Sequence, residues 1–112
     1  MICGVYKITC KINNRIYIGS SMNIKQRWAT HKRELNNNEH DNMFLQRDWN
    51  RYGEENFNFE ILEECEFGTQ FVVEQKYLNQ LKPFFKDGTG YNIKQDTGFG
   101  NVYSEEVKDN KV

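Results

Sequence analysis

Long hydrophobic runs are missing from this sequence of 112 residues. A membrane-spanning helix needs about 18 consecutive apolar residues, and no run approaches that length. The first residues, MICGVYK, do not have the shape of a signal peptide. We therefore expect an intracellular, cytoplasmic protein without a membrane association.

Cysteine is scarce, and its number is odd. The three cysteines, Cys3, Cys10 and Cys65, form no C-x-x-C pair. This pattern fits reduced, partly buried thiols better than a disulfide framework or a zinc site. Hydrophobic residues make up 38% and aromatic residues 14% of the chain, which is enough for one compact domain.

A large net charge is also missing, since the formal value is only -1. The charges are nevertheless unevenly distributed. Residues 1–52 contain nine basic and four acidic side chains, whereas residues 53–112 contain six basic and twelve acidic ones. A polyanion would therefore meet the N-terminal half of the chain, and we expect it to bind weakly without help from elsewhere.

Two short segments, residues 4–10 and 15–20, are rich in Ile, Val, Thr and Tyr and predict a β-hairpin. Asn13-Asn14 is the expected two-residue turn, because Asn tolerates left-handed backbone geometry. This turn predicts the cross-strand pairs Ile12–Arg15, Cys10–Tyr17, Ile8–Gly19 and Tyr6–Ser21. Side chains alternate between the faces of a strand, so Tyr6 and Tyr17 should share one face. Gly19 would leave an uncovered place there for a ligand.

Helical patterns follow the hairpin. Asn23 is a plausible N-cap for a helix over NIKQRWATHKREL, in which His31 falls within an apolar stripe and Arg27 lies at its rim. A second helix, MFLQRDWNRY, should end at Gly53. FNFEILEEC predicts a third strand. We thus expect an α+β fold with a small three-stranded antiparallel sheet flanked by about three helices.

The third predicted helix lies in TQFVVEQKYLNQLKPFF and is broken at Pro83. Its expected apolar stripe consists of Phe71, Val73, Tyr77, Leu78 and Leu81. Glu74 falls near the middle of this stripe, where an unpaired charge would cost several kcal/mol. Its carboxylate must be paired, protonated or bound to a metal. We expect the domain to cover residues 1–95, with residues 96–112 forming a tail or linker.

Each candidate site residue also has a structural interpretation. Tyrosine is a common strand residue, a histidine on an apolar helix face often belongs to the core, and a rim arginine can cover the core with its stem. Together, however, these residues suit phosphodiester hydrolysis. A guanidinium such as Arg27 can stabilise phosphoryl charge, Glu74 can hold a hard divalent ion, and Tyr or His can accept a proton from water. A single carboxylate argues against a two-metal site.

Five sequence pieces in order carry a family resemblance. GVY (residues 4–6), YIG (residues 17–19), RWATH (residues 27–31), Glu74 and GYNI (residues 90–93) resemble the motifs of the GIY-YIG nuclease superfamily. The segment HDNMFLQRDWNRYGEENFNFEILEE is similar to the catalytic domains of phage intron-encoded homing endonucleases. The resemblance covers about residues 3–94 and implies a phage or bacterial source.

The resemblance also implies roles for individual residues. Both tyrosines would assist the nucleophilic water, Arg27 would bind the scissile phosphate, and Glu74 would hold a single Mg²⁺ or Mn²⁺ ion. His31 would orient or deprotonate a tyrosine. Asn92 would position the phosphate or the metal-bound water, and His40 matches an auxiliary histidine of the homing subgroup. Which group is the general base stays open.

The implied substrate is double-stranded DNA, with no organic cofactor. Homing relatives continue into a separate DNA-binding region, so this chain is expected to be either an isolated catalytic domain or a small free-standing nuclease. The competing hypothesis is a non-catalytic nucleic-acid-binding module whose sheet tyrosines stack on bases. Such a module would gain nothing from Glu74 on an apolar face.

Overall fold

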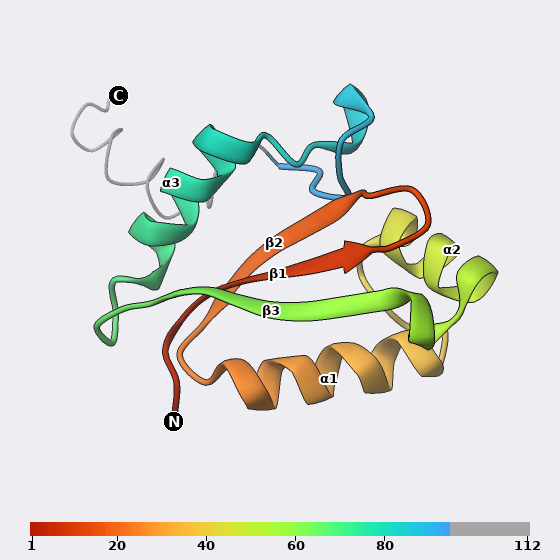
Figure 1. The fold of residues 1–112 in the computed structure, drawn as a ribbon. Coiled ribbons are helices and arrows are strands. Elements are labelled where there is room, and N and C mark those ends of the chain that lie inside the picture. Colours follow the sequence, from red (N-terminus) through yellow and green to blue (C-terminus); the bar gives the residue numbers. More distant parts are fainter. Residues whose placement is uncertain (95–112) are drawn as a thin grey trace, which may run out of the picture.

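The structure, a computed structural model, describes residues 1–94. Its elements are strands β1 (Gly4–Cys10), β2 (Ile16–Ser21) and β3 (Phe57–Glu64), helices α1 (Ile24–Asn36), α2 (Met43–Tyr52) and α3 (Gln70–Leu81), and 3-10 turns η1 (Glu54–Asn56) and η2 (Phe85–Asp87) (Figure 1). The predicted α+β fold with a three-stranded antiparallel sheet is confirmed. No helix within residues 1–94 combines the length and apolarity needed to cross a membrane. The predicted tail, residues 96–112, lies outside the described residues.

The loop between β1 and β2 differs from the prediction. It contains five residues, Lys11 to Arg15, and is closed by hydrogen bonds from the Cys10 N–H to the Arg15 carbonyl at 2.9 Å and from the Asn14 N–H to the Cys10 carbonyl at 2.8 Å. Asn14 adopts a left-handed conformation with φ 63°, but Asn13 does not. The two-residue turn of the predicted type needs two such residues, so it does not form.

The hairpin register is consequently shifted by two residues, and the predicted pairs were wrong. Tyr6 lies opposite Gly19, and Ile8 lies opposite Tyr17. Because side chains alternate with a period of two, a shift of two residues leaves every side chain on its predicted face. Tyr6 and Tyr17 therefore share one face of the sheet, as expected.

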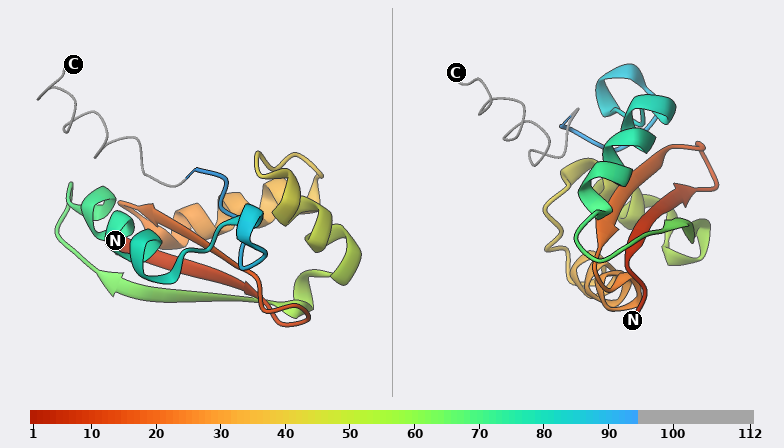
Figure 2. Two further views of the ribbon diagram at one scale, coloured as in Figure 1. Left: turned by 90° about the horizontal axis from the view of Figure 1, so that it is seen from above. Right: turned by 90° about the vertical axis from the view of Figure 1, so that its left-hand side faces the viewer.

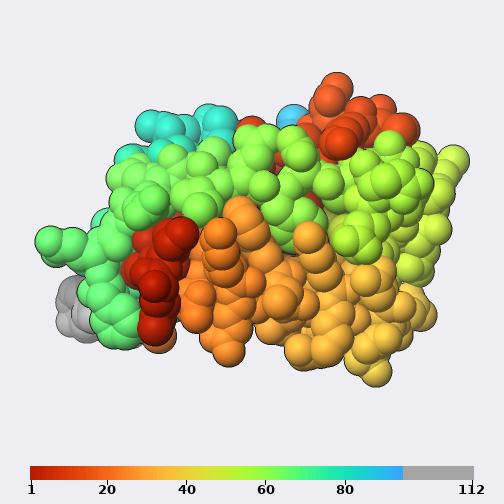
Figure 3. Space-filling model, turned by 60° about the horizontal axis from the view of Figure 1, so that its bottom comes forward, coloured from red at the N-terminus to blue at the C-terminus, as the bar shows by residue number. Residues whose placement is uncertain are grey.

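The sheet has the order β2-β1-β3, so β1 is central and β2 is an edge strand. One face, which carries Tyr6, Ile8 and Cys10, packs against α1 and α2. The other face packs against α3, where Val5 and Ile18 meet Leu78. Figure 2 shows α1 and α3 on opposite sides of the sheet, and Figure 3 shows α1 and β3 side by side on the surface of the molecule.

Local sequence signals fix the helix ends. The Asn23 side chain accepts a hydrogen bond from the Gln26 N–H at the start of α1, and Asn42 caps α2 in the same way. Gly53, with φ 90°, ends α2 as predicted. Helix α3 ends at Leu81, two residues before Pro83, which cannot continue the helix.

The apolar stripe of α3 is shorter than predicted. Leu78 is buried, and Val73 and Tyr77 are partly buried against the sheet. Phe71 and Leu81 are exposed to 38% and 43%, so the prediction was wrong at both ends of the helix. The helix rests on the sheet through its middle, and its first turn projects toward the pocket described below.

After α3, residues 83–94 return along the free edge of β2. The Tyr91 N–H donates to the Ile16 carbonyl at 2.8 Å, and the Asn92 amide exchanges two hydrogen bonds of 2.9 Å with the backbone of Ile18. Gly90 is required at this crossing, because a Cβ atom would lie 2.2 Å from the Pro83 carbonyl oxygen. The segment therefore covers an edge strand that would otherwise expose its polar backbone.

Candidate active site

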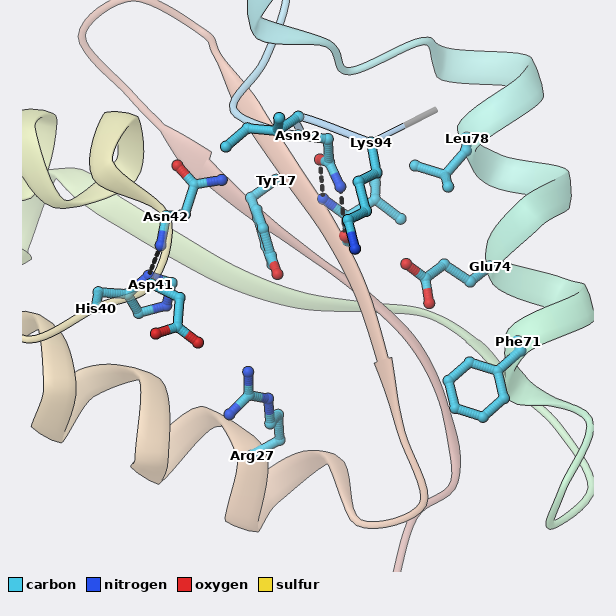
Figure 4. Close-up of a pocket in the computed structure, with 12 residues that line it drawn as sticks. Tyr17, Arg27, His40, Asp41, Asn42, Phe71, Glu74, Leu78, Asn92 and Lys94 are labelled. Carbon is cyan, nitrogen blue, oxygen red and sulfur yellow. Dashed lines mark hydrogen bonds between the residues drawn. The ribbon is translucent and has the colours of Figure 1, made fainter. Parts of the chain in front are cut away.

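A pocket of about 380 Å³ lies at the free edge of β2. It is lined by side chains from the helices on both faces of the sheet. Tyr17 enters it from β2, Arg27 from α1, His40 from the loop before α2, Glu74 from α3 and Asn92 from the returning segment (Figure 4). Five of the predicted site residues thus line one pocket. Tyr6, His31 and Gly19 do not line it.

Tyr6 lies behind the pocket and is only 1% exposed. Its hydroxyl is 2.6 Å from His31 Nε2, and His31 is fully buried. A Cβ atom on Gly19 would come within 2.5 Å of the Tyr6 hydroxyl. The expectation of an open place above Gly19 was therefore wrong, because the Tyr6 phenol fills it. Gly19 makes room for Tyr6 rather than for a ligand.

Tyr6, His31 and His40 form a continuous hydrogen-bonded chain. His31 Nδ1 lies 2.7 Å from His40 Nε2, and His40 Nδ1 accepts the backbone N–H of Asn42 at 3.0 Å. A backbone N–H can only donate, so His40 Nδ1 carries no proton and, in the neutral ring, Nε2 does. His40 then donates to His31, and His31 Nε2–H donates to the Tyr6 oxygen. The network therefore assigns one direction to all three bonds.

Burial keeps both histidines neutral. It lowers the pKa of His31 to about 3, with smaller contributions from the positive charge of Arg27 and from His40. Burial also lowers the pKa of His40, against the raising effect of Glu34. The hydrogen-bonded chain needs both imidazole rings in the neutral form. The lowered pKa values of the two histidines therefore agree with the assigned proton positions.

The two tyrosines are joined through His31. The ring of His31 lies 5.7 Å from the Tyr6 ring and 5.6 Å from the Tyr17 ring, both edge to face. Burial raises the pKa of both phenols, and Arg27 acts in the opposite direction on each of them. Arg27 is thus placed where it favours negative charge on either tyrosine.

Glu74 faces the pocket from the side opposite Arg27 (Figure 4). Burial raises the pKa of its carboxyl group, and a hydrogen bond from the Ser20 hydroxyl to Oε1, at 2.5 Å, acts against that rise. Ser20 was not predicted as a site residue. The strand alternation could have found it, because Ser20 lies on the same face of β2 as Ile18, which packs against α3.

Asn92 uses both ends of its side-chain amide on β2. Its Oδ1 accepts the Ile18 N–H, and its Nδ2 donates to the Ile18 carbonyl. The residue is 9% exposed and lines the pocket. Asn92 therefore holds the edge strand in place, and the expected contact with phosphate stays a prediction.

Two groups could hold a metal ion. Ligand atoms of His31, Glu34 and His40 lie within 4.8 Å of one another. However, the two nitrogens that face each other there are occupied by the His31–His40 hydrogen bond, and His40 Nδ1 accepts a backbone N–H that prevents the tautomer needed for metal binding through Nε2. Glu74 instead offers carboxylate oxygen to an open pocket, as a hard divalent ion prefers.

The pocket also contains charged residues that sequence reasoning missed. Asp41 and Lys94 line it together with the predicted residues (Figure 4). A single carboxylate was expected at the site, whereas Asp41 supplies a second one on the opposite side of the pocket from Glu74. Asp41 follows His40 in an irregular polar loop, where no periodicity indicates which way a side chain points.

Several known proteins resemble this chain in sequence or in structure. The chain is 33% identical over 104 residues to Intron-associated endonuclease 1 of Enterobacteria phage T4; the match covers 93% of this chain and 41% of that protein. The chain thus spans less than half the length of this curated relative.

Two solved structures are similar as well. A mutant of the catalytic domain of intron endonuclease I-TevI superposes with a TM-score of 0.76 and 30% identity, covering 87% of this chain and 98% of that one. The catalytic domain of homing endonuclease I-TevI gives a TM-score of 0.70 and 29% identity, covering 82% and 98%. The family model described as the GIY-YIG catalytic domain matches residues 2–92. This chain therefore belongs to the GIY-YIG nuclease superfamily, next to the catalytic domains of intron homing endonucleases.

Proposed function

We propose that this chain is the catalytic domain of a homing-type endonuclease that hydrolyses phosphodiester bonds of double-stranded DNA with one divalent metal ion. The observation that carries the proposal is the pocket in which Arg27 and Glu74 lie on opposite sides and Tyr17 lines the space above Arg27. A phosphate held between them would meet positive charge on one side and a metal ligand on the other. The homing endonuclease relatives support DNA as the substrate.

Arg27 would bind the scissile phosphate. Its planar guanidinium can donate two parallel hydrogen bonds to phosphoryl oxygens, and charge on these oxygens changes during the reaction. In the pocket without DNA, the charge of Arg27 offsets part of the effect of burial, which raises the pKa of both tyrosines. Substrate binding and tyrosine ionisation would thus share one guanidinium.

Glu74 would bind the metal ion. Nucleases of this family depend on a divalent metal, and we propose Mg²⁺ or Mn²⁺ because the available ligand is a carboxylate oxygen in an open pocket. Such an ion stabilises the charge of the leaving alkoxide when it is bound. Ser20 would fix one carboxylate oxygen of Glu74 and so orient the other toward the pocket.

The Tyr6–His31–His40 chain would manage the proton of the attacking water. Tyr17 lines the pocket and can contact that water directly, whereas Tyr6 acts from behind it. Because His31 donates to the Tyr6 oxygen, the phenol proton of Tyr6 points away from His31. In this arrangement His31 would orient the Tyr6 hydroxyl and would not deprotonate it, and burial, which raises the pKa of Tyr6, would keep its proton in place. Both tyrosines therefore belong to the proposed catalytic set.

The domain boundaries and the cellular context are further parts of the proposal. We propose residues 1–95 as the catalytic unit, a range that agrees with the family match to residues 2–92. The longer curated relative supports a separate DNA-binding region in a full-length enzyme, and a DNA substrate supports an intracellular site of action. Weak binding by the near-neutral catalytic domain alone fits that arrangement.

Plasmid nicking tests the function. Supercoiled plasmid is incubated with the purified protein, with Mg²⁺ or with EDTA, and Glu74→Ala serves as the matched inactive variant. We expect nicked product from the wild-type protein with Mg²⁺ and none from the variant or with EDTA. DNA binding without any cleavage would favour the base-stacking module, and full activity of Glu74→Ala would contradict the metal assignment.

A further inference from the structure

Two arginines gather around a stacked pair of phenylalanines beside the pocket. The rings of Phe44 and Phe85 are stacked 3.5 Å apart at an interplanar angle of 7°. The Arg15 guanidinium carbon lies 4.7 Å from the Phe85 ring centre, and that of Arg47 lies 5.5 Å from Phe85 and 5.7 Å from Phe44. We name this group the Arg15–Arg47 cluster. It joins the β1–β2 loop, α2 and η2, three segments far apart in the sequence.

The cluster borders the pocket through backbone contacts. The Phe85 N–H donates to the carbonyl of Asn92 at 3.0 Å, and the Phe44 N–H donates to the side chain of Asn42 at 3.1 Å. Asn92 and Asn42 both line the pocket. Each phenylalanine is therefore fixed directly to a wall of the proposed catalytic site.

Each guanidinium is held on one side and keeps free donors on the other. Arg15 Nη1 donates to the Gly90 carbonyl at 3.3 Å, and Arg47 Nε lies 3.4 Å from Asp48 Oδ1. A guanidinium has five N–H donors, so most remain available. The Arg47 side chain is 54% exposed. Asp48, by contrast, is buried and also accepts hydrogen bonds from Asn13 and Tyr91.

Fixed guanidiniums of this kind suit phosphate. The stacked rings hold the guanidinium groups and so limit the side-chain entropy lost on binding, and planar guanidinium groups match phosphate oxygens. Of the two guanidinium groups only that of Arg47 contacts a carboxylate in the described part of the chain, the buried one of Asp48, so the Arg15–Arg47 cluster keeps a net positive charge. Arg47 is paired with Asp48, but within residues 1–94 the charge of Arg15 shows no carboxylate partner, because its guanidinium donates to a backbone carbonyl.

We propose that the Arg15–Arg47 cluster is a second phosphate-binding surface, which holds the backbone of double-stranded DNA next to the scissile phosphate. The proposal rests on the proposed endonuclease function and extends it, because it predicts where the duplex leaves the pocket. Bound DNA would run from Arg27 past Asn42 and Asn92 to the cluster. This contact is independent of base sequence and would position the substrate.

Salt-dependent binding tests the proposal. Anisotropy of a fluorescent DNA duplex is measured with EDTA present, so that no cleavage occurs, between about 50 and 200 mM salt. Loss of one phosphate contact reduces the slope of log K against log salt by about 1. We expect this reduction for Arg15→Ala and for Arg47→Ala, and a reduction of about 2 for the double variant.

Arg51→Ala is the matched control. Arg51 lies on the same helix as Arg47, one turn later, and contacts the Tyr52 ring instead of the cluster. The Arg51→Ala substitution removes the same charge as the other two, but we expect it to keep the wild-type slope of log K against log salt. Thermal melts of all variants separate loss of contact from loss of fold. If the wild-type protein nicks plasmid but Arg15→Ala and Arg47→Ala keep its salt slope, the second surface is wrong and the nuclease stands. If the wild-type protein neither binds nor cuts DNA, the proposed function itself fails.

Discussion

The two walls of the pocket are built on different physical terms. On the α1 wall His40 lines the pocket, and the buried Tyr6 and His31 lie behind it; the three side chains are neutral and linked by hydrogen bonds of fixed direction. The α3 wall carries one charged group, the Glu74 carboxylate, which the Ser20 hydroxyl supports and which faces an open space. Proton transfer needs donors and acceptors aligned in advance, whereas a metal ion arrives from solvent with its own waters. The contrast indicates that the α1 wall is preorganised for proton transfer, whereas the α3 wall is left accessible to a metal ion.

The tyrosines carry the largest expected difference. Phenylalanine keeps each ring but removes the hydroxyl, and we expect turnover to fall by about 10²–10⁴ in Tyr6→Phe and in Tyr17→Phe. Since both act on one proton path, the double variant should lose much less than the product of the two single losses. Single-turnover cleavage of all four proteins measures this. Full activity of Tyr17→Phe would rule out the proposed proton path.

The free energy of unfolding should differ between Tyr6→Phe and Tyr17→Phe. Tyr6→Phe leaves the buried His31 Nε2–H without its acceptor, which costs about 1–3 kcal/mol. Tyr17 is only partly buried, and within residues 1–94 its hydroxyl shows no hydrogen bond, so Tyr17→Phe should change the free energy of unfolding little. Denaturant unfolding checks both values. Equal stability of the two variants would mean that the Tyr6–His31 bond contributes nothing.

Arg27 is expected to have the next largest effect. It links the walls, because it lies on the opposite side of the pocket from Glu74 and its charge also opposes the rise that burial causes in the pKa of both tyrosines. Removal of one preorganised donor to a charged transition state costs about 10²–10³ in rate. Arg27→Lys should not restore this loss, since an ammonium group lacks the planar fork. Near-normal single-turnover cleavage by Arg27→Lys would contradict a two-pronged phosphate contact.

A smaller effect is expected at Ser20. Loss of a residue that orients a metal ligand weakens metal affinity by about 10–100-fold. We therefore expect Ser20→Ala to need more Mg²⁺ for half-maximal cleavage, Ser20→Thr to restore the wild-type midpoint, and saturating Mg²⁺ to recover most of the rate. Ser21→Ala is the control, because its hydroxyl accepts the Asn23 N–H instead. If Ser20→Ala needed the same Mg²⁺ concentration for half-maximal cleavage as the wild-type protein, the Ser20–Glu74 hydrogen bond would have no role in metal binding.

The buried histidines predict a modest dependence of stability on pH. His31 has a pKa of about 3 when folded and about 6.5 when unfolded, so below pH 6.5 the unfolded chain binds a proton that the folded chain does not. Stability should therefore fall between pH 6.5 and 3, by about 2 kcal/mol at pH 5 relative to pH 7. Denaturant unfolding at both pH values measures the loss. His31→Gln should flatten this dependence, and an equally steep loss in that variant would assign it to other groups.

Sequence reasoning predicted the elements that depend on local signals. Asn23, Asn42 and Gly53 mark helix ends through contacts within a few residues, and strand alternation placed Tyr6 and Tyr17 on one face despite the wrong turn. A shift by one residue would have separated the tyrosines, so the face was predicted more securely than the register.

The remaining features depend on long-range packing. The bonds between Asn92 and Ile18 join residues 74 positions apart, and the stacked rings of Phe44 and Phe85 come from segments that share no periodic pattern. The α3 stripe failed at Phe71 and Leu81, because a helical wheel shows which residues share a face but not how far the partner surface extends. Contacts of this kind form only when distant segments have packed together, so local sequence patterns do not predict them.

Manganese binding tests most directly the claim that the two walls have separate tasks. Binding of Mn²⁺ is titrated by electron paramagnetic resonance in the wild-type protein, Glu74→Gln, Glu34→Gln and His40→Gln, without DNA. We predict that Glu74→Gln loses the bound ion, whereas Glu34→Gln and His40→Gln keep the wild-type affinity. Retention of Mn²⁺ by Glu74→Gln, with loss in the other two variants, would place the metal at the His31–Glu34–His40 group and contradict the account.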